Sequence, residues 1–451
     1  MSSEVVEPIE RQDVAAALTG WPPSLRAATR GALNLASQRG VLSVADQAIV
    51  SGTSFLTAAI IARACTTEQL GLYYLTMSLV LILTGIQEQV ITAPYTIYRA
   101  RHQGPALAEY TGSVWLHHLM FIGISWILLL VAIPTLSALG ASNFVAGLWV
   151  LLLVGPLLLV REAVRRFAFA HFQFASAMAL DGAIAVVQLT SILLLARLKL
   201  LSIGAIFGVI AAACALACCG WILLKLPDVR VNRARVLRDW RDNWSFAQWA
   251  LPSFLVGNTT PLIMAWIVTL MDGTAATGLL GACAALVGVV NVFILGVANA
   301  LTPRTAHAFA RGGVDELRRV LITTALMLIA VLGMSFLAML FAGDQIAVLV
   351  YGEQFRGSGP TLATLALSVV ATSVGMTTGN GLWALGLPRA NLIPDLCGLI
   401  VTLLGAVMLV HPYGALGAAI AMLAGTTTAA TARTAILLRA MNGFRLQTRV
   451  A

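Results

Sequence analysis

The sequence predicts an all-α membrane protein of about twelve spanning helices, arranged in two related lobes of six. Its composition excludes a soluble globular class, since 59% of the 451 residues are hydrophobic and only 10% are charged. The mean hydropathy is +0.89. Long apolar runs recur between short polar gaps from Val41 onward. A bilayer core requires roughly 20 apolar residues per helix, and the runs do not alternate as barrel strands do, so we expect helices.

The apolar runs between charged or turn-rich gaps define the predicted spans. A polar cytoplasmic leader, 1–40, precedes them, and its first ten residues hold three acids, which excludes a cleaved signal peptide. We expect residues 1–20 to be disordered and a short helix to follow Pro23. In chain order the spans are 41–63, 70–98, 111–139, 143–161, 176–196, 200–225, 244–270, 275–303, 320–342, 358–386, 389–411 and 413–438.

The basic residues orient these spans, because cytoplasmic loops hold an excess of Lys and Arg. With the N-terminus inside, 24 of the 28 basic residues fall on the inner side. Both termini are therefore expected in the cytoplasm. The net charge of +9 follows from this asymmetry beside an anionic leaflet, so no nucleic-acid partner is needed.

A polar break in the middle of the chain divides the spans into two sets of six. Similar features recur at an offset of roughly 210 residues, such as Gly71 with Gly278 and Asp181 with Asp395. This order indicates a duplicated unit whose halves are related by an axis along the membrane normal. The predicted divisions are an N-lobe at 41–226, a linker at 227–243, a C-lobe at 244–440 and a cytoplasmic tail at 441–451.

Three stretches resemble segments of Wzx-type polysaccharide (O-antigen) flippases, which belong to the multidrug/oligosaccharidyl-lipid/polysaccharide exporter superfamily. They are GLLGACAALVGVVNVFILGVANALTPRTAHAFARGG (278–313), YGEQFRGSGPTLATLAL (351–367) and HPYGALGAAIAMLAG (411–425). The resemblance implies two lobes around a V-shaped central cavity. It also implies a substrate that is an oligosaccharide on a polyprenyl pyrophosphate carrier, moved from the inner to the outer leaflet for lipopolysaccharide synthesis.

The same resemblance implies the partners. These are the lipid-linked oligosaccharide, the membrane lipids, and a polysaccharide polymerase with glycosyltransferases. No cofactor and no metal are expected, since the chain lacks HExxH, Walker and GxSxG motifs. Transport would then draw on an ion gradient or on consumption of the product, and the choice between proton and sodium stays open.

Glu88 interrupts an apolar run in LILTGIQEQVITAPY and is the acid with the clearest functional signal. It lies 11 residues from Arg99, about 16 Å along the helix, and therefore near the middle of the membrane. A charge there costs a few kcal/mol and usually faces a cavity or a partner. Pro94 should kink the helix beside it. Together with Gln87 and Gln89 it is either a cavity acid that binds sugar or a coupling proton, or a neutral group bonded between helices.

Three aspartates lie near the predicted cytoplasmic starts of helices, namely Asp46, Asp181 and Asp395. The partial positive charge of a helix N-terminus stabilises a nearby acid, which explains all three without a function. The functional alternative is that the repeat-related pair, Asp181 and Asp395, lines the inner mouth of the cavity and takes part in gating or cation coupling.

Arg161, Arg165 and Arg166 lie at the predicted inner end of the fourth span. They form either a positive-inside cluster or a capture site for the carrier's pyrophosphate, which arginine binds through two parallel hydrogen bonds. No arginine or lysine falls at predicted mid-depth, so we expect the cavity to be lined by polar groups. Candidates for sugar contacts, each also explained by bonds between helices, are Gln188, Asn258, Asn291, Asn299 and Asn380.

Three other functions compete with the flippase. An ion-coupled multidrug or small-molecule exporter of the same superfamily would use acids deep in the cavity, which Glu88 permits. A membrane glycosyltransferase or ligase needs a large outer loop, whereas the longest predicted outer gap is 343–357. A scaffold without transport would not require polar residues at mid-depth. The six cysteines lie mostly in apolar runs and are interpreted as small packing residues.

Overall fold

The fold is known from a computed structural model, which describes residues 23–450 apart from 139–141, 226–228 and 259. Most of the predicted leader therefore lies outside the described residues. Within the described part every regular element is a helix. The predicted all-α class is thus confirmed. The helix expected after Pro23 is present and continues into the first span without a break.

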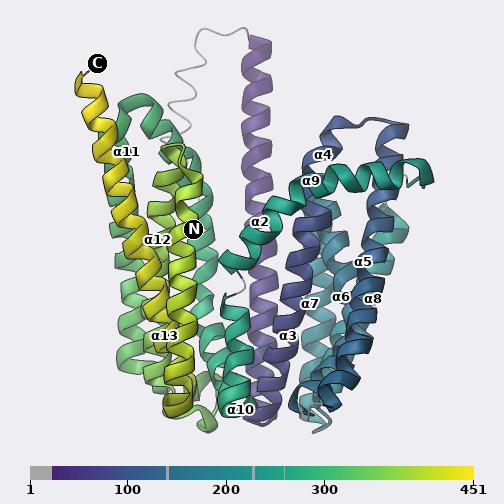
Figure 1. The fold of residues 1–451 in the computed structure, drawn as a ribbon. Coiled ribbons are helices and arrows are strands. Elements are labelled where there is room, and N and C mark those ends of the chain that lie inside the picture. The colour runs from purple at the N-terminus through teal and green to yellow at the C-terminus, as the bar shows by residue number, and fades with distance from the viewer. Residues whose placement is uncertain (1–22, 139–141, 226–228, 259, 451) are drawn as a thin grey trace.

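The N-lobe contains the first group of helices (Figure 1). One of its segments, at Glu88–Thr92, has the wider π-helical winding instead of the α-helical one. The elements are α2 (Pro23–Ala64), α3 (Thr67–Gln87), η1 (Glu88–Thr92), α4 (Ala93–Tyr98), η2 (Arg99–Arg101), α5 (Pro105–Ala138), α6 (Ser142–Ala170), α7 (Phe174–Arg197) and α8 (Ile203–Lys225).

The linker helix and the C-lobe form the second group. Three of the helices contain a glycine with positive φ, where the chain turns: Gly273 (87°), Gly313 (61°) and Gly414 (54°). The elements are α9 (Arg233–Asn258), α10 (Thr260–Val287), η3 (Gly288–Val290), α11 (Asn291–Tyr351), η4 (Glu353–Phe355), α12 (Gly359–Ala384), η5 (Pro388–Asn391) and α13 (Leu392–Val450).

These three turns account for the predicted number of spans. The described residues contain nine helical stretches that are long and apolar enough to cross a membrane. One of them covers 92 residues, Thr260–Tyr351, which is far longer than a bilayer is thick and includes the first two turns. Dividing the stretches at the three glycines gives twelve segments in the order of the predicted spans, but the seventh begins at Thr260, whereas its predicted span begins at 244.

The lobes meet at one end of the molecule and separate toward the other. Figure 1 shows them spread apart where α9 and the C-terminus lie, here called the linker end. At the opposite, distal end, α3 and α10 pack backbone to backbone. A Cβ atom on Gly71 would lie 1.8 Å from the Thr274 carbonyl oxygen, and one on Gly278 would lie 2.2 Å from that of Thr67. The repeat-related glycines therefore meet each other, as expected for residues beside a pseudo-twofold axis.

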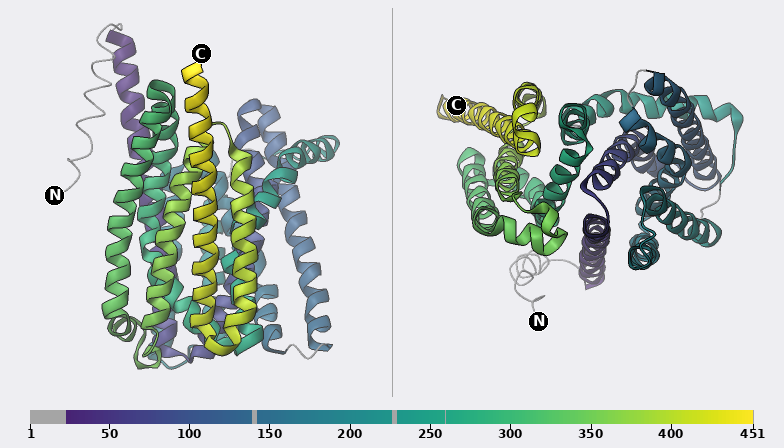
Figure 2. Two further views of the ribbon diagram at one scale, coloured as in Figure 1. Left: turned by 60° about the vertical axis from the view of Figure 1, so that its left-hand side comes forward. Right: turned by 90° about the horizontal axis from the view of Figure 1, so that it is seen from below.

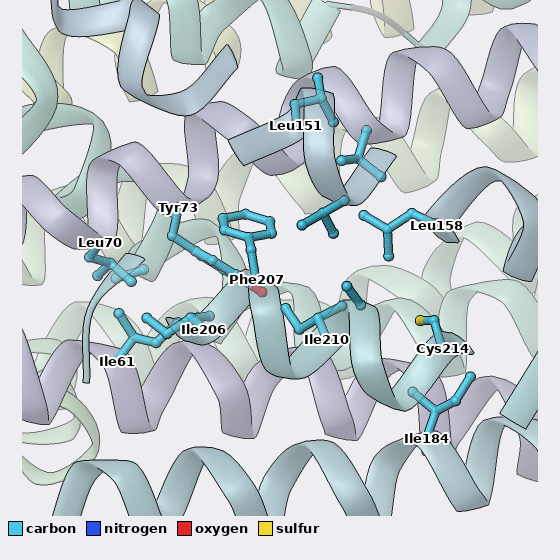
Figure 3. Packing of buried hydrophobic residues seen from close by; sticks show 14 of the residues in the cluster. Ile61, Leu70, Tyr73, Leu151, Leu158, Ile184, Ile206, Phe207, Ile210 and Cys214 are labelled. Atoms are coloured by element: carbon cyan, nitrogen blue, oxygen red, sulfur yellow. The ribbon is translucent and has the colours of Figure 1, made fainter. Parts of the chain in front are cut away.

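The hydrophobic core follows the same division. The largest cluster of buried side chains includes residues from both lobes, such as Ile61 and Tyr351, so the lobes share one core at the distal end. Its N-lobe part packs Tyr73, Phe207 and Ile210 between helices (Figure 3). A separate cluster around Leu317 and Leu437 belongs to the C-lobe alone. Figure 2, viewed from below, shows the two groups of helices with α9 running between them along one edge.

Two predicted boundaries are wrong, and the segment predicted as a linker contains a helix. The fourth span ends at Ala170 and not at 161, because the arginines that suggested its end are paired with acids and do not terminate the helix. The outer gap predicted at 343–357 shrinks to 352–358, because α11 continues to Tyr351. The linker predicted at 227–243 is helical from Arg233, since one of its faces packs on α5.

Candidate functional site

Charged residues from four helical elements meet inside the N-lobe and form what we call the N-lobe charge cluster. All but one of its members were candidates from the sequence, and the exception is Glu162. The members are Asp46 on α2, Glu88 on η1, Arg161, Glu162, Arg165 and Arg166 on α6, and Asp181 on α7.

Arg165 is the centre of the buried half of this cluster. Its Nη2 donates to Oδ2 of Asp46 at 2.7 Å, and its Nε donates to Oδ2 of Asp181 at 2.7 Å. Arg161 donates to the other oxygen of Asp181. The side chains of both aspartates are 1% exposed. This half joins α2, α6 and α7 through two buried carboxylates and two arginines that are mostly buried.

Arg166 is the centre of the more exposed half. Its Nη2 donates to Oε2 of Glu88 at 2.8 Å, and its Nε donates to Oε1 of Glu162 at 2.7 Å. The side chains of Arg166 and Glu88 are 34% and 31% exposed. Glu88 is therefore bonded between two helical elements, η1 and α6. It forms an ion pair with one of the arginines that were predicted to capture pyrophosphate.

The local backbone explains how Glu88 reaches this position. The N–H of Ala93 bonds to the carbonyl of Glu88, a five-residue spacing that defines the π turn just before Pro94. Such turns insert an extra residue and are frequent at functional sites. Gln87 points into the bundle, where its side chain is buried and donates to the Leu159 carbonyl at 3.2 Å. The predicted distortion at Pro94 is confirmed.

The charges of the cluster do not cancel. Three arginines face four carboxylates, which leaves one negative charge in excess when all are ionised. Among the described residues no group donates to Oδ1 of Asp46, although that atom is buried. A buried, unpaired charge is costly, so this set has the capacity to take up a proton or a cation.

A cavity of about 390 Å³ lies beside the cluster, between the lobes. On the N-lobe side its wall includes the guanidinium groups of Arg165 and Arg166 and the rings of Phe169 and Phe174. On the C-lobe side the wall is apolar. The other residues that line the cavity are Val44, Gln47 and Thr96 from the N-lobe and Val292, Leu295 and Gly296 from the C-lobe.

A second cavity of about 120 Å³ lies inside the N-lobe. Arg161, Glu162 and Asp181 line it together with Gln188 and Thr53. Gln188 is also held by a hydrogen bond to the Thr57 hydroxyl at 2.8 Å. Most of its other lining residues are apolar, and the space is of the size for a few water molecules or a small ion.

The C-lobe has a simpler counterpart. Asp395 lies in the first turn of α13, as predicted, and accepts a hydrogen bond from Arg433. Its side chain is 36% exposed, and it lines neither of the two cavities. The helix-start explanation fits Asp395, but it does not fit Asp181, which lies beyond the first turn of α7, and it does not apply to Asp46. Because α2 begins at Pro23, Asp46 lies more than six turns from the helix start.

Of the predicted sugar-contacting amides whose side chains are described, Asn291 and Asn380 do not line the central cavity, and Gln188 lines the N-lobe cavity. Asn380 accepts a hydrogen bond from the Thr302 hydroxyl at 2.7 Å and donates to the Met376 carbonyl, so it connects α11 and α12. Asn291 is exposed at the start of α11. The side chains of Asn258 and Asn299 lie outside the described residues.

Several lining residues were not predicted from the sequence. Gln47 and Thr96 are ordinary polar residues in apolar segments, and Phe169 and Leu295 look like packing residues there. Only Glu162 carried a usable signal, since it precedes Arg166 by four residues, a spacing that favours an ion pair on one helix face.

Comparison with known proteins places this geometry in a wider context. A family model described as polysaccharide biosynthesis protein matches residues 38–309. A search of curated proteins found no match. An inward-facing multidrug resistance MATE family transporter of the MOP superfamily aligns with a TM-score of 0.72 and 15% identity, over 88% of this chain and 95% of its own.

Two further solved structures show the same fold. The lipid II flippase MurJ, in an inward closed conformation, aligns with a TM-score of 0.70 and 12% identity over 91% of each chain. An outward-facing MATE family transporter aligns with a TM-score of 0.58 and 16% identity, over 90% of this chain and 95% of its own.

Proposed function

This chain belongs to the polysaccharide biosynthesis protein family, and from that premise we propose that it is a flippase for a polyprenyl-pyrophosphate-linked oligosaccharide. It moves this substrate from the inner to the outer leaflet by alternating access, in support of surface polysaccharide synthesis. The linker end then faces the cytoplasm, both termini are cytoplasmic, and the membrane is the inner membrane. A polymerase and glycosyltransferases act on the same pathway.

The cavity between the lobes is the observation that carries this proposal. One wall presents the arginine side chains of α6, and the opposing wall presents Val292, Leu295 and Gly296. An amphipathic substrate with a diphosphate at the junction of sugar and lipid matches such a division. Guanidinium groups recognise phosphate oxygens in pairs, and the apolar wall is compatible with the first isoprene units.

Glu88 supplies a way to make Arg166 available only when substrate arrives. In the present state its carboxylate occupies the guanidinium face that a phosphate would need. Because that guanidinium is one third exposed, an incoming phosphate has access to it and exchanges for the carboxylate. Protonation of Glu88 favours the exchange, since a neutral acid binds Arg166 less strongly than a carboxylate does.

The excess negative charge of the N-lobe charge cluster supplies the coupling. Asp46 and Asp181 share Arg165, so uptake of one proton or sodium ion at this pair changes how α2, α6 and α7 are held together. These helices belong to the lobe that must move against the C-lobe. Asp395 and Arg433 have the equivalent place in the C-lobe, where greater exposure gives them a weaker role.

Binding of the carrier diphosphate tests the site. Undecaprenyl pyrophosphate bearing a fluorescent oligosaccharide is titrated into the purified protein in detergent. Arg165→Gln with Arg166→Gln should weaken binding roughly a hundredfold, because two charge-assisted contacts are lost. The matched control is Arg238→Gln with Arg241→Gln, two exposed arginines on α9. If both double variants bound the substrate with equal affinity, Arg165 and Arg166 would not be part of the binding site.

A second candidate is an ion-coupled exporter of multidrug or small-molecule substrates from the same superfamily. It is favoured by the enclosed N-lobe cavity and the surplus carboxylate, which suit a cationic ligand. The two candidates separate in one experiment. Binding of a hydrophobic cation such as ethidium, with no binding of the lipid-linked oligosaccharide, would establish the exporter.

A further inference from the structure

The motif YGEQF at 351–355 lies away from the cavity, at the distal end. Its first residue, Tyr351, is the last residue of α11 in the C-lobe, and η4 begins within it. Tyr351 and Phe355 are fully buried there, and the Tyr351 ring lies 6.4 Å from that of Phe55 on α2, in the other lobe. Residues of this motif therefore belong to the contact that keeps the distal end closed.

Two polar side chains cross the same contact in opposite directions. Arg63, in the last turn of α2, donates from Nε to the Val350 carbonyl at 2.8 Å and from Nη2 to the Leu349 carbonyl. Gln354 donates from Nε2 to the Ala62 carbonyl, with a longer contact of 3.4 Å to that of Cys65. Each side chain thus binds the C-terminal carbonyls of the helix in the other lobe.

Helix ends make these bonds valuable. The last four carbonyls of an α-helix have no partner within the helix, and the C-terminus carries partial negative charge. Here α2 and α11 end next to each other, so their free carbonyls would repel across the interface. Arg63 adds a cation beside the end of α11, and Gln354 adds a donor beside the end of α2. Separation of the lobes at this end breaks both sets of bonds at once.

We infer that Arg63 and Gln354 form a reciprocal inter-lobe latch that holds the distal end closed and sets the balance between the two conformations of the transporter. They are positioning residues, since neither lies at the cavity. The close approach of Gly71 and Gly278 lets the backbones meet, and the latch holds them there. The inference rests on the proposed alternating access, but it makes no use of the substrate.

The test measures distance across the distal end. Spin labels are attached at Leu200→Cys in the N-lobe and Tyr413→Cys in the C-lobe, two exposed positions at that end. The six native cysteines are replaced in this background. Double electron–electron resonance in lipid nanodiscs then gives the fraction of molecules with the distal end open, in the absence of substrate.

Arg63→Gln combined with Gln354→Ala should raise the ratio of open to closed molecules roughly tenfold, because a charged and a neutral capping bond are lost. Gln354→Asn, which keeps the amide but shortens the side chain, should give a smaller rise. If the double variant does not fold, the single variants decide the question. The matched control is Arg356→Gln on the same loop, whose ion pair with Glu353 stays within the C-lobe.

An unchanged distance distribution in the latch variants would overturn the inference, and so would an equal change in the Arg356→Gln control. This outcome is independent of the substrate. The latch variants could open the distal end as expected while the protein moves no lipid-linked oligosaccharide. That result would support the latch and refute the proposed function.

Discussion

At the scale of single residues, the main finding is that the candidate acids and bases of this sequence are each other's partners. Glu88 binds Arg166, while Asp46 and Asp181 share Arg165. A bilayer-spanning helix tolerates these charges because Asp46, Glu88 and Asp181 are each paired with an arginine of a neighbouring helix. The arginines thus hold the lobe together, and those beside the cavity also offer their exposed edges to a ligand.

Burial should decide how much each pair contributes to stability. Asp181→Asn leaves two arginines without their carboxylate in a site that is 1% exposed, so we expect a loss on the order of 3 kcal/mol. The repeat-related change Asp395→Asn affects a side chain that is 36% exposed and should cost much less. Thermal unfolding in detergent, followed by tryptophan fluorescence, measures both. Equal shifts of the unfolding midpoint would contradict the buried network.

Glu88→Gln should separate the ion-pair role from the coupling role. The amide keeps the size of the side chain but neither holds Arg166 by charge nor takes up a proton. We therefore expect tighter binding of the lipid-linked substrate, by several-fold, and transport that no longer varies with pH. Initial transport rates in vesicles between pH 5.5 and 8 measure this.

The matched control for this change is Glu109→Gln. Glu109 pairs with Arg235 and is exposed to the same extent as Glu88, 31%, but its arginine, unlike Arg166, does not line the cavity. It should leave the pH profile as it is. If the pH profile of transport by Glu88→Gln were identical to that of the unmodified protein, Glu88 would have no role in coupling.

The sequence was informative about individual residues but not about their partners. Glu88 was identifiable because it interrupts an apolar run, and Arg161 because it follows one. Their pairing was not, since it depends on the rotation of α6 and on the extra residue of the π turn. The end of α6 was misplaced for the same reason. The sequence does not distinguish an arginine that is paired inside the bundle from one that is exposed to water beyond the end of a helix.

At the scale of helices, the π segment before Pro94 sets where Glu88 points. Pro94→Ala restores a backbone N–H and allows the ordinary α-helical pattern to continue, which rotates the preceding residues relative to α6. We expect loss of the Glu88–Arg166 pair and at least a tenfold slower transport. Proximity of the two positions is measured by cross-linking of Glu88→Cys with Arg166→Cys, with and without the Pro94 change.

The helix α5 provides the control for this effect. Pro134 lies inside α5 and is exposed, and it lines neither of the two cavities. Pro134→Ala should leave transport and cross-linking unchanged. If it lowered transport as much as Pro94→Ala does, the effect would be a general one of helix prolines, and the π segment would have no special role.

At the scale of the whole molecule, the duplication was the most useful signal in the sequence. It predicted two lobes of six helices and singled out Gly71 and Gly278 as equivalent residues. The structure places these two glycines against each other, because equivalent residues near the axis of a twofold arrangement must meet. The latch was not predictable, since Arg63 and Gln354 are not equivalent residues and donate only to backbone carbonyls, which every sequence has.

The two-lobe arrangement also shows how the molecule could alternate between two conformations. The lobes share a core at the distal end, whereas part of the C-lobe has a core of its own. The opposite conformation requires only that the lobes separate at the distal end and approach each other at the linker end. The cavity beside Arg166 would then face the other leaflet, with its lining residues retained.

The movement of a lipid-linked oligosaccharide across a bilayer tests the central claim most directly. Purified protein is reconstituted into vesicles that contain undecaprenyl pyrophosphate bearing a fluorescent oligosaccharide, and a membrane-impermeant quencher reports how much remains in the inner leaflet. The proposed function predicts that the protected fraction falls with time, and that Arg166→Gln slows the fall. A protected fraction that stays constant, in vesicles where the same protein transports ethidium, would contradict it.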